Sequence, residues 1–531
     1  MLNTVSAMWS RWWSASNDKD ELSRANFTAL VSIFAVLFWF LWAAKKSRNP
    51  PLPPGPRGLP LLGYLPFLGT NLHRKFEELA GVYGPIYKVW LGQKLCVVIS
   101  SPSLVKEVVR DQDTIFANRD PPIAARVASY GGVDIAFSSY GPEWKKLRKI
   151  FVREMLSNAS LDSSYTLRRE EVKKSIRNVY DKIGTPIDLG VLAFVTGVNA
   201  IMNMVWGDSL QGEEGTKIGA EFKKLVGEQM VLMAKPNVSD FFPVLAMFDL
   251  QGIERQAKKI LKWVEAILDS AIDKRMNSDT GKKMGTGQIE QRKDFLQFLL
   301  ELKEQDGAAT SISMTQLKAL LMDIVVGGAE TTSTMVEWVM AELMHHPQVM
   351  RKVHEELAKS VGLDILVEES HLPKLHYLDA VIKETFRLHP PLPFLVPRCP
   401  SQSSTIGGYY IPKGTMVWLN VWAIHRDPKI WKNPLEFQPE RFLNDSSNLD
   451  YSGNNFNYFP FGSGRRICAG LPLAERTLIY ILASLLHSFE WKLPHDTELE
   501  FSDNFGIVTK KLNPAVALPT PRLSNFELYT K

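Results

Sequence analysis

Residues 461–470, with the sequence FGSGRRICAG, place a lone cysteine, Cys468, between a glycine-rich loop and an apolar helical pattern. At the start of a helix, free N–H groups and the helix dipole favour a thiolate over a thiol. Because no second cysteine or histidine lies nearby at zinc spacing, the pattern indicates a single-thiolate metal centre. Gly462 and Gly464 let a flat cofactor approach the backbone, and Arg466 can meet an anionic group. Haem has that shape and charge, and a buried structural cysteine is the alternative.

A second unusual group, GGAETT at residues 327–332, interrupts an apolar helical pattern. Ser313 and Gln316 have the spacing of a capping box, and the helix can continue to Pro347. Each glycine inside a helix costs about 1 kcal/mol relative to alanine. The group therefore indicates a functional reason for the glycines, and a packing notch with satisfied threonine hydroxyls is the alternative.

Two charged residues share one face of a shorter helical pattern at residues 377–388, which ends before two prolines. Glu384 and Arg387 are three positions apart, and an exposed ion pair at this spacing is common and contributes little. Downstream, residues 439–442 (PERF) add a further arginine, Arg441. Together the three residues favour a structural network over an isolated surface pair.

These motifs resemble those of the cytochrome P450 family, whose haem loop has the pattern Phe-x-x-Gly-x-Arg-x-Cys-x-Gly. The resemblance implies that Cys468 is the proximal thiolate ligand of the iron of haem b. It also implies that Glu330 and Thr331 are the acid and the hydroxyl of a pair on the central helix. In the family, that pair lies over the distal haem face, opens an oxygen pocket and relays protons.

The resemblance assigns further residues to structural and cofactor-binding roles. Glu384, Arg387 and Arg441 match the family's Glu-Arg-Arg network, which locks the haem-loop region and takes no chemical part. Residues 144–148 (WKKLR) match the family's Trp-x-x-x-Arg. The residues expected to hold the haem are Trp144, Arg148, Arg398, Phe461 and Arg466. A solvated helix face is the alternative for Arg148, because lysines surround it.

The match extends from a proline-rich hinge to about Pro519, and it is most similar to a plant A-type subgroup that contains sesquiterpene hydroxylases. It implies a monooxygenase that uses O₂ and electrons from NADPH-cytochrome P450 reductase, with cytochrome b5 as an optional further partner. The expected substrate is a small apolar plant metabolite, first of all a sesquiterpene or monoterpene, and a flavonoid or other phenol is the alternative. A reductase-independent haem isomerase or dehydratase and a non-catalytic haem protein are the other open function classes.

The segments that face the substrate in the family are apolar in this chain. They contain Val127, Ile135, Ala136, Phe137, Val325, Val326, Leu392, Phe394, Leu395, Phe505, Ile507 and Val508. Charged recognition is scarce in these segments, which favours an apolar substrate of terpenoid size. The alternative is that any segment next to a core is apolar.

The elements that must position these residues alternate helical patterns with short strand-like runs, and helix predominates. We expect a mainly α cytochrome P450 fold with a minor β region and one N-terminal transmembrane helix. The expected order is an N-terminal segment at residues 1–24, an anchor at 25–44, a basic, proline-rich hinge at 45–58 and a catalytic domain at 59–531. Residues 277–292, rich in Lys, Gly, Ser and Thr, are expected to form an exposed loop.

Residues 25–44 carry no charge, and a helix of this length spans the roughly 30 Å hydrocarbon core of a bilayer. A buried core helix or a cleaved signal peptide is less well matched, because the run is long and is followed by Lys45, Lys46 and Arg48. These basic residues favour a cytosolic catalytic domain. We therefore expect a single-pass protein of the endoplasmic reticulum membrane.

The composition is that of an ordinary globular protein, 45% hydrophobic and 22% charged. The formal net charge of +5 is spread along the chain, so the sequence indicates no nucleic-acid partner. Its 3 cysteines, an odd number in 531 residues, exclude a secreted disulfide framework and favour a reducing compartment.

Overall fold

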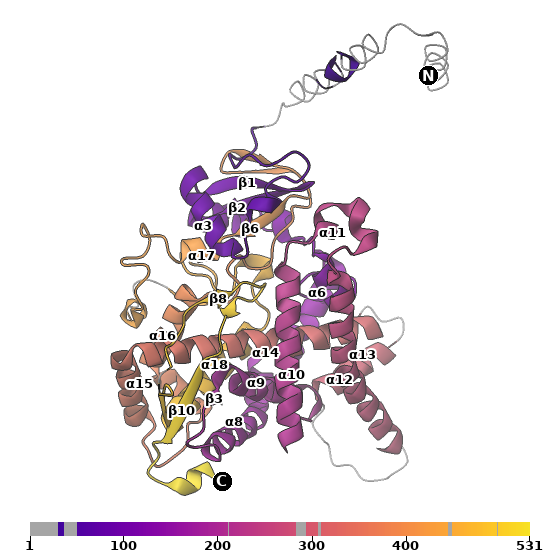
Figure 1. Cartoon of the computed structure of the whole chain (residues 1–531). Coiled ribbons are helices and arrows are strands. Elements are labelled where there is room, and N and C mark those ends of the chain that lie inside the picture. Colours follow the sequence, from indigo (N-terminus) through magenta and orange to yellow (C-terminus); the bar gives the residue numbers. More distant parts are fainter. Residues whose placement is uncertain are drawn as a thin grey trace. The chain divides into compact units, whose positions relative to one another are not determined.

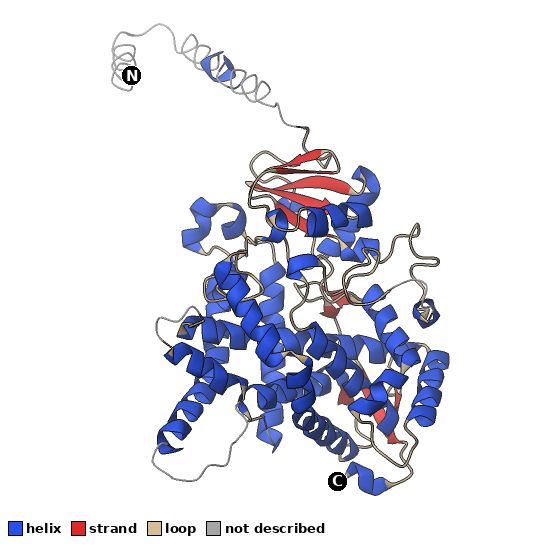
Figure 2. Ribbon diagram, turned by 180° about the vertical axis from the view of Figure 1, so that it is seen from behind, coloured by secondary structure: helices blue, strands red, loops and turns tan. Residues whose placement is uncertain are grey.

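The structure is a computed structural model that describes residues 30–34, 36, 50–210, 212–282, 294–305, 310–443, 449–495 and 497–530. Every motif described above except the anchor lies in a compact unit formed by Pro53–Gly407 and Ile411–Lys531. Helices make up most of this unit, and the strands form small separate sheets (Figure 2). The predicted mainly α fold with a minor β region is confirmed.

The helices begin where the sequence supplies caps or prolines. The α-helices are α3 (Leu72–Tyr83), α4 (Pro102–Lys106), α5 (Ile123–Ala128), α6 (Pro142–Ile150), α7 (Asn158–Ser163), α8 (Tyr165–Tyr180), α9 (Leu189–Trp206), α10 (Gly212–Ala234), α11 (Val238–Phe241), α12 (Ile253–Lys282), α13 (Phe295–Glu304), α14 (Met314–His345), α15 (Pro347–Ser360), α16 (His376–Leu388), α17 (Val421–Ile424) and α18 (Leu471–Ser488). Proline occupies the first turn of α4, α6, α15 and α18, where its fixed φ fits the helix and its missing N–H costs nothing.

Short helical turns complete the connections. The 3₁₀ turns are η1 (Leu65–Phe67), η3 (Ile115–Ala117), η5 (Pro243–Phe248), η6 (Glu369–Lys374), η7 (Pro439–Phe442), η9 (Gly464–Arg466) and η10 (Phe526–Tyr529), and the π turns are η2 (Glu107–Asp111) and η4 (Phe151–Met155). The helix α12 continues to Lys282, so the first part of the predicted surface loop at 277–292 is helical. That prediction was wrong there because a formed helix adds residues at little cost, whatever their polarity.

The strands are few and short. They are β1 (Ile86–Leu91), β2 (Lys94–Ile99), β3 (Ile187–Asp188), β4 (Ser404–Ile406), β5 (Tyr409–Ile411), β6 (Met416–Leu419), β7 (Phe489–Lys492), β8 (Asp503–Asn504), β9 (Lys510–Lys511) and β10 (Val516–Pro521). In the first sheet β2 pairs antiparallel with β1 and parallel with β6. The strand β10 lies between β3 and β7, and β8 pairs antiparallel with β9, so that Asn504 is opposite Lys510.

The long helix α14 connects two hydrophobic cores. Residues 317–329 of this helix pack with α9, α10, α12 and α13, and residues 335–343 pack with α15, α16 and α18. Figure 1 shows α14 running through the unit with α9 and α10 lying across it. Ser313 caps its first turn with Gln316 in a reciprocal capping box, as predicted. The polar residues 330–334 therefore lie where the two cores meet.

The structure tests the membrane prediction only in part. Within the described residues, α9 is the helix that is long and apolar enough to cross a bilayer, and 83% of its residues are buried inside the fold. An apolar helix buried all round is a core helix. Of the predicted anchor at residues 25–44, only 30–34 and 36 are described; they are helical and exposed. The remainder of the anchor lies outside the described residues, so the anchor stays a prediction.

Candidate active site

The Cys468 loop is held in shape by its glycines and by backbone hydrogen bonds. Gly462 and Gly464 adopt φ values of 76° and 70°, the left-handed region that favours glycine. A Cβ at Gly464 would also overlap the carbonyl oxygen of Val109. The N–H of Cys468 donates to the carbonyl of Phe461 at 2.9 Å, which turns the cysteine toward the start of α18.

The surroundings of Cys468 act on its thiol in opposite directions. The cysteine is exposed, yet the surrounding protein desolvates the thiol and raises its pKa. The N–H groups of Gly470 and Leu471 and the positive charge of Arg148 oppose this rise. In the protein alone, the effect of burial on the Cys468 thiol therefore outweighs the effect of the helix start, which we expected to favour a thiolate. A metal ion bound to the sulfur would reverse this balance, because a coordinating thiol is deprotonated.

Three buried arginines lie close together beside this loop. Arg466 donates to the carbonyls of Ala117, Ile135 and Ser138 at 2.7, 3.1 and 2.5 Å. Arg398 donates to the Ser463 carbonyl at 2.8 Å and lies 3.4 Å from a carboxylate oxygen of Asp113. Arg119 donates to the carbonyls of Val396 and Pro397 at 2.5 and 2.9 Å.

These three guanidinium groups carry more positive charge than the described acids around them offset. Burial and then the charge of Arg398 lower the pKa of Arg466 to about 9. Burial and then the charges of Arg466 and Arg398 lower the pKa of Arg119 well below its ordinary value. A buried cluster of like charges is costly unless an anion neutralises it. The cluster is therefore suited to an anionic group.

Arg148 and Trp144, both on α6, lie on the same side of the loop. Arg148 donates to the carbonyl of Ile467 at 2.7 Å. The indole N–H of Trp144 donates to the carbonyl of Ile135 at 2.9 Å, so its hydrogen bond goes to the protein backbone. The guanidinium of Arg466 lies 4.4 Å above the Trp144 ring. The indole thus orients Arg466 as well as packing against it.

The two glycines of α14 serve different purposes. A Cβ at Gly328 would lie 2.7 Å from Cδ1 of Ile201, so this glycine is a packing notch against α9. A Cβ at Gly327 would meet nothing within 4 Å, and Gly327 is exposed although it lies mid-helix. The hydroxyl of Thr331 donates to the Gly327 carbonyl at 2.7 Å on the same open face. One glycine therefore supports the packing alternative, and the other leaves open space beside a hydroxyl.

The open faces of α14 and of the Cys468 loop border the same core. Val326, next to Gly327, and Ala469, next to Cys468, both pack against the first hydrophobic core. Gly327 and Cys468 are thus each next to a residue of the same core. The side chain of Glu330, the residue before Thr331, is 1% exposed.

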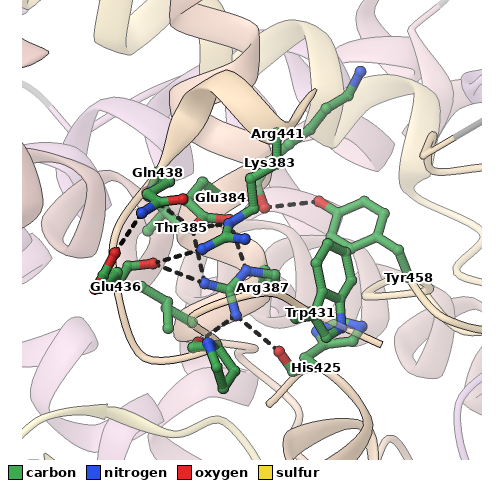
Figure 3. A network of polar contacts seen from close by, with 12 residues as sticks. Lys383, Glu384, Thr385, Arg387, His425, Trp431, Glu436, Gln438, Arg441 and Tyr458 are labelled. Atoms are coloured by element: carbon green, nitrogen blue, oxygen red, sulfur yellow. Dashed lines mark hydrogen bonds and ion pairs between the residues drawn. The ribbon is translucent and has the colours of Figure 1, made fainter. Parts of the chain in front are cut away.

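The predicted Glu-Arg-Arg residues form one buried network (Figure 3). Arg387 donates to both carboxylate oxygens of Glu384 at 2.7 and 2.8 Å, and both side chains are 0% exposed. Arg441 donates to the same carboxylate at 3.1 Å. Arg387 also donates to the backbone carbonyls of His425 and Pro434. The exposed-pair alternative is excluded, and the network ties α16 to the chain that precedes the Cys468 loop.

An apolar cavity gathers part of the predicted substrate-facing set. Phe137, Phe394, Leu395, Phe505 and Ile507 line it, together with charged residues that were not predicted, namely Lys94, Arg119, Asp120, Lys235 and Asp240. Lys94 pairs with Asp120 at 2.6 Å. Burial raises the pKa of Asp240, whose carboxylate accepts from the backbone N–H of Ile123. The expectation that charges are scarce was wrong for this cavity, because the loops that supply them come from elsewhere in the chain.

Comparison with known proteins assigns the family. The cytochrome P450 family model matches residues 53–518. The chain belongs to the cytochrome P450 family. It is 38% identical over 508 residues to a flavonoid 3′-monooxygenase of Crocosmia x crocosmiiflora, covering 94% of this chain and 97% of that protein. It is 36% identical over 499 residues to ferruginol synthase of Isodon rubescens, covering 92% of this chain and 98% of that protein. A zebra fish cytochrome P450 structure with progesterone is 29% identical, with a TM-score of 0.71, covering 85% of this chain and 99% of that one.

Cytochrome P450 enzymes carry haem b, and the residues of this chain fit that group. The exposed thiol of Cys468 is a suitable axial ligand, and the arginine cluster is suited to two propionates. The open face at Gly327 leaves space beside the Thr331 hydroxyl. Arg119 was missed by the sequence analysis, because a lone arginine before Asp120 and two prolines carries no signal until the fold buries it.

Proposed function

We propose that this cytochrome P450 monooxygenase oxidises a flavonoid or another phenolic substrate. The observation that carries the proposal is the similarity to flavonoid 3′-monooxygenases, which extends over nearly the whole of both chains. This favours the phenolic alternative over the terpenoid that we first expected. Because the chain is also similar to ferruginol synthase, other small ring compounds should be tested as substrates too.

The cavity supports a substrate that is flat and polar at its edge. Phe137, Phe394 and Phe505 offer aromatic surface, which stacks on aromatic rings. The Lys94–Asp120 pair offers a donor and an acceptor to a phenolic hydroxyl. A saturated hydrocarbon would desolvate this ion pair without offering it a further hydrogen bond, which is unfavourable. A phenol would offer one.

The chain's own residues then have separate tasks. Cys468 binds the iron, and Arg119, Arg398 and Arg466 neutralise the propionates. The haem thiolate, when bound, supplies reductive activation of O₂. Thr331 would hold its hydroxyl beside the open face of α14, and Glu330 would serve as the acid of the proton relay. Glu384, Arg387 and Arg441 hold the surrounding chain in place.

Electrons come from a partner in this proposal. A concave surface next to the Cys468 loop is lined by Tyr140, Trp144, Lys145, Arg148, Lys149, Val152, Gly464 and Arg465. Lys145, Lys149 and Arg465 make it basic, and complementary charge accelerates docking of an acidic partner. NADPH-cytochrome P450 reductase is the donor expected at this surface.

Purified full-length protein with reductase should convert a phenolic compound to a product that gains one oxygen atom. The panel comprises flavanones, flavones and simple phenols beside monoterpenes and sesquiterpenes, and products are identified by mass spectrometry. Reactions without reductase serve as the control and should give no product. Conversion of terpenes alone would overturn the phenolic proposal, and conversion without reductase would favour an isomerase or dehydratase.

We also propose that the chain is held at the endoplasmic reticulum membrane by the helix at residues 25–44, with the catalytic unit in the cytosol. The described part of the chain has an exposed apolar patch that would assist. Its residues are Leu59, Leu61, Leu62, Phe67, Val244, Leu245, Met247, Phe248 and Leu250. The turn between β1 and β2 joins the two halves of the patch, since Gly92 bonds to the Leu62 carbonyl and Gln93 to the Phe241 carbonyl.

Removal of residues 1–48 should release most of the protein from microsomal membranes after a carbonate wash. A residual fraction is expected to bind lipid vesicles through the apolar patch, because buried apolar area provides interfacial affinity. Serine at Val244, Met247 and Phe248 in the truncated chain should abolish that fraction, measured by vesicle flotation. Retention of the truncated chain as complete as that of the full chain would contradict the anchor.

A further inference from the structure

The acid of α14 has a counter-ion that comes from the C-terminal hairpin. The Nζ of Lys510, on β9, lies 3.4 Å from Oε1 of Glu330. The Glu330 side chain is 1% exposed, and among the described residues its Oε2 has no hydrogen-bond partner. Burial of a charged group is unfavourable unless a cation or hydrogen bonds compensate for it. Lys510 is the cation at this position.

Room for the Lys510 ammonium is made by a glycine of a third element. A Cβ at Gly227, on α10, would overlap Nζ of Lys510 and would lie 3.7 Å from Oε1 of Glu330. A glycine inside a helix is unfavourable by about 1 kcal/mol relative to alanine, so helix propensity does not account for a glycine at this position. The Lys510 ammonium therefore occupies space that a side chain at position 227 would fill.

The hairpin fixes which lysine reaches the acid. Successive residues of a strand point to opposite faces, so Lys510 and Lys511 diverge. The Lys511 ammonium bonds to the Glu500 carbonyl and lies 4.8 Å from the centre of the Trp338 ring. Lys510 points to Glu330 and is 22% exposed, so its side chain extends from the surface to the buried acid. The backbone N–H of Thr509 donates to the Pro391 carbonyl at 2.7 Å, which anchors the strand.

We propose that Lys510 is a positioning residue for proton delivery in this monooxygenase. Its ammonium holds Oε1 of Glu330 in one position, which leaves Oε2 as the oxygen that exchanges a proton. The space at Gly227 makes this contact possible. The proposal rests on the proposed roles of Glu330 and Thr331, and it adds a residue from a segment 180 positions away from Glu330 in the sequence.

Lys510→Gln should lower product per NADPH severalfold and raise hydrogen peroxide, while haem content and KM stay as in the parent. Loss of a proton-transfer element slows its step by about 10²–10⁴-fold, and electrons from NADPH then leave as hydrogen peroxide instead of forming product. Gly227→Ala should give the same shift with both charged residues intact. Lys510→Arg should retain coupling. The assay uses full-length protein, reductase and the panel phenol that gives most product.

Two control variants match these changes. Lys492→Gln removes one positive charge from an exposed position on β7, and Gly81→Ala adds a methyl group on α3 where a Cβ meets nothing within 4 Å. Both should behave as the parent. A fall in coupling in either control equal to that of Lys510→Gln would overturn the proposal.

A spectroscopic measurement tests the ion pair without turnover. The infrared spectrum of Lys510→Gln should show a carboxyl band displaced from its position in the parent, because the ammonium that contacts Oε1 is gone. The band should vanish in the double variant Lys510→Gln/Glu330→Gln, which assigns it to Glu330. Absence of the band together with parent-like coupling would overturn the role of Lys510. If Lys510→Gln fails to retain haem, the coupling assay and the infrared spectrum are measured on Gly227→Ala instead.

Thr331→Ala separates this inference from the function on which it rests. Thr331→Ala should uncouple turnover, with an unchanged thiolate spectrum, and Thr331→Ser should restore coupling. A fully coupled Thr331→Ala would remove the relay itself. If Thr331→Ala is uncoupled while Lys510→Gln and Gly227→Ala remain coupled, the relay role of Thr331 stands. That result would overturn only the proposed role of Lys510.

Discussion

Cys468→Ser is expected to abolish the absorption band that the reduced carbon-monoxide complex of a thiolate-ligated haem shows. The thiol of Cys468 is exposed, and a serine hydroxyl at that position is neither a thiolate nor a comparable ligand. Turnover of every panel compound should fall to the background level. The measurement is the difference spectrum of the reduced protein with and without carbon monoxide.

Cys399→Ser is the matched control for this change. Cys399 is a partly buried free cysteine, and burial raises the pKa of its thiol to about 11, so it is not a thiolate at neutral pH. Its loss should leave the band in place. A Cys468→Ser protein that keeps the band would show that another residue ligates the iron.

Glu384→Gln should lower the free energy of unfolding by about 3–5 kcal/mol, the cost of breaking a buried ion pair by removing one partner. Glu384 accepts from Arg387, from Arg441 and from the backbone N–H of Gln438. A neutral amide cannot balance the guanidinium of Arg387, which is 0% exposed. Denaturant unfolding followed by circular dichroism measures the change, and haem content should fall with it.

Glu440→Gln provides the comparison for that loss. Glu440 lies in the neighbouring turn η7, is 49% exposed and pairs with Lys352. Exposed pairs contribute roughly 0–1 kcal/mol, so this variant should unfold almost as the parent does. Equal stability of Glu384→Gln and Glu440→Gln would remove the structural role of the network shown in Figure 3.

The sequence predicted those parts of the fold that local chemistry determines. The capping box of Ser313 and Gln316 marked the start of α14, and Pro347 marked its end. The Cys468 loop was recognisable because its glycines and its cysteine are contiguous. Each of these signals is read within about ten residues of chain.

The rest depends on contacts between distant segments. Arg119 contacts carbonyls 277 and 278 positions away, and Lys510 reaches an acid 180 positions away. No spacing in the sequence indicates that these residues are neighbours in the fold. The preference of Cys468 for the thiol in the protein alone was also unforeseen, since a helix start acts locally whereas desolvation comes from the whole surrounding fold.

The arginine cluster has a consequence for how the enzyme matures in the cell. The charges of Arg398 and Arg466 lower the pKa of a neighbouring guanidinium, so an anion between these arginines would relieve their repulsion. A group that binds only the folded form stabilises it more, the more tightly it binds. Newly made chains are therefore expected to gain stability around the cluster when they acquire haem.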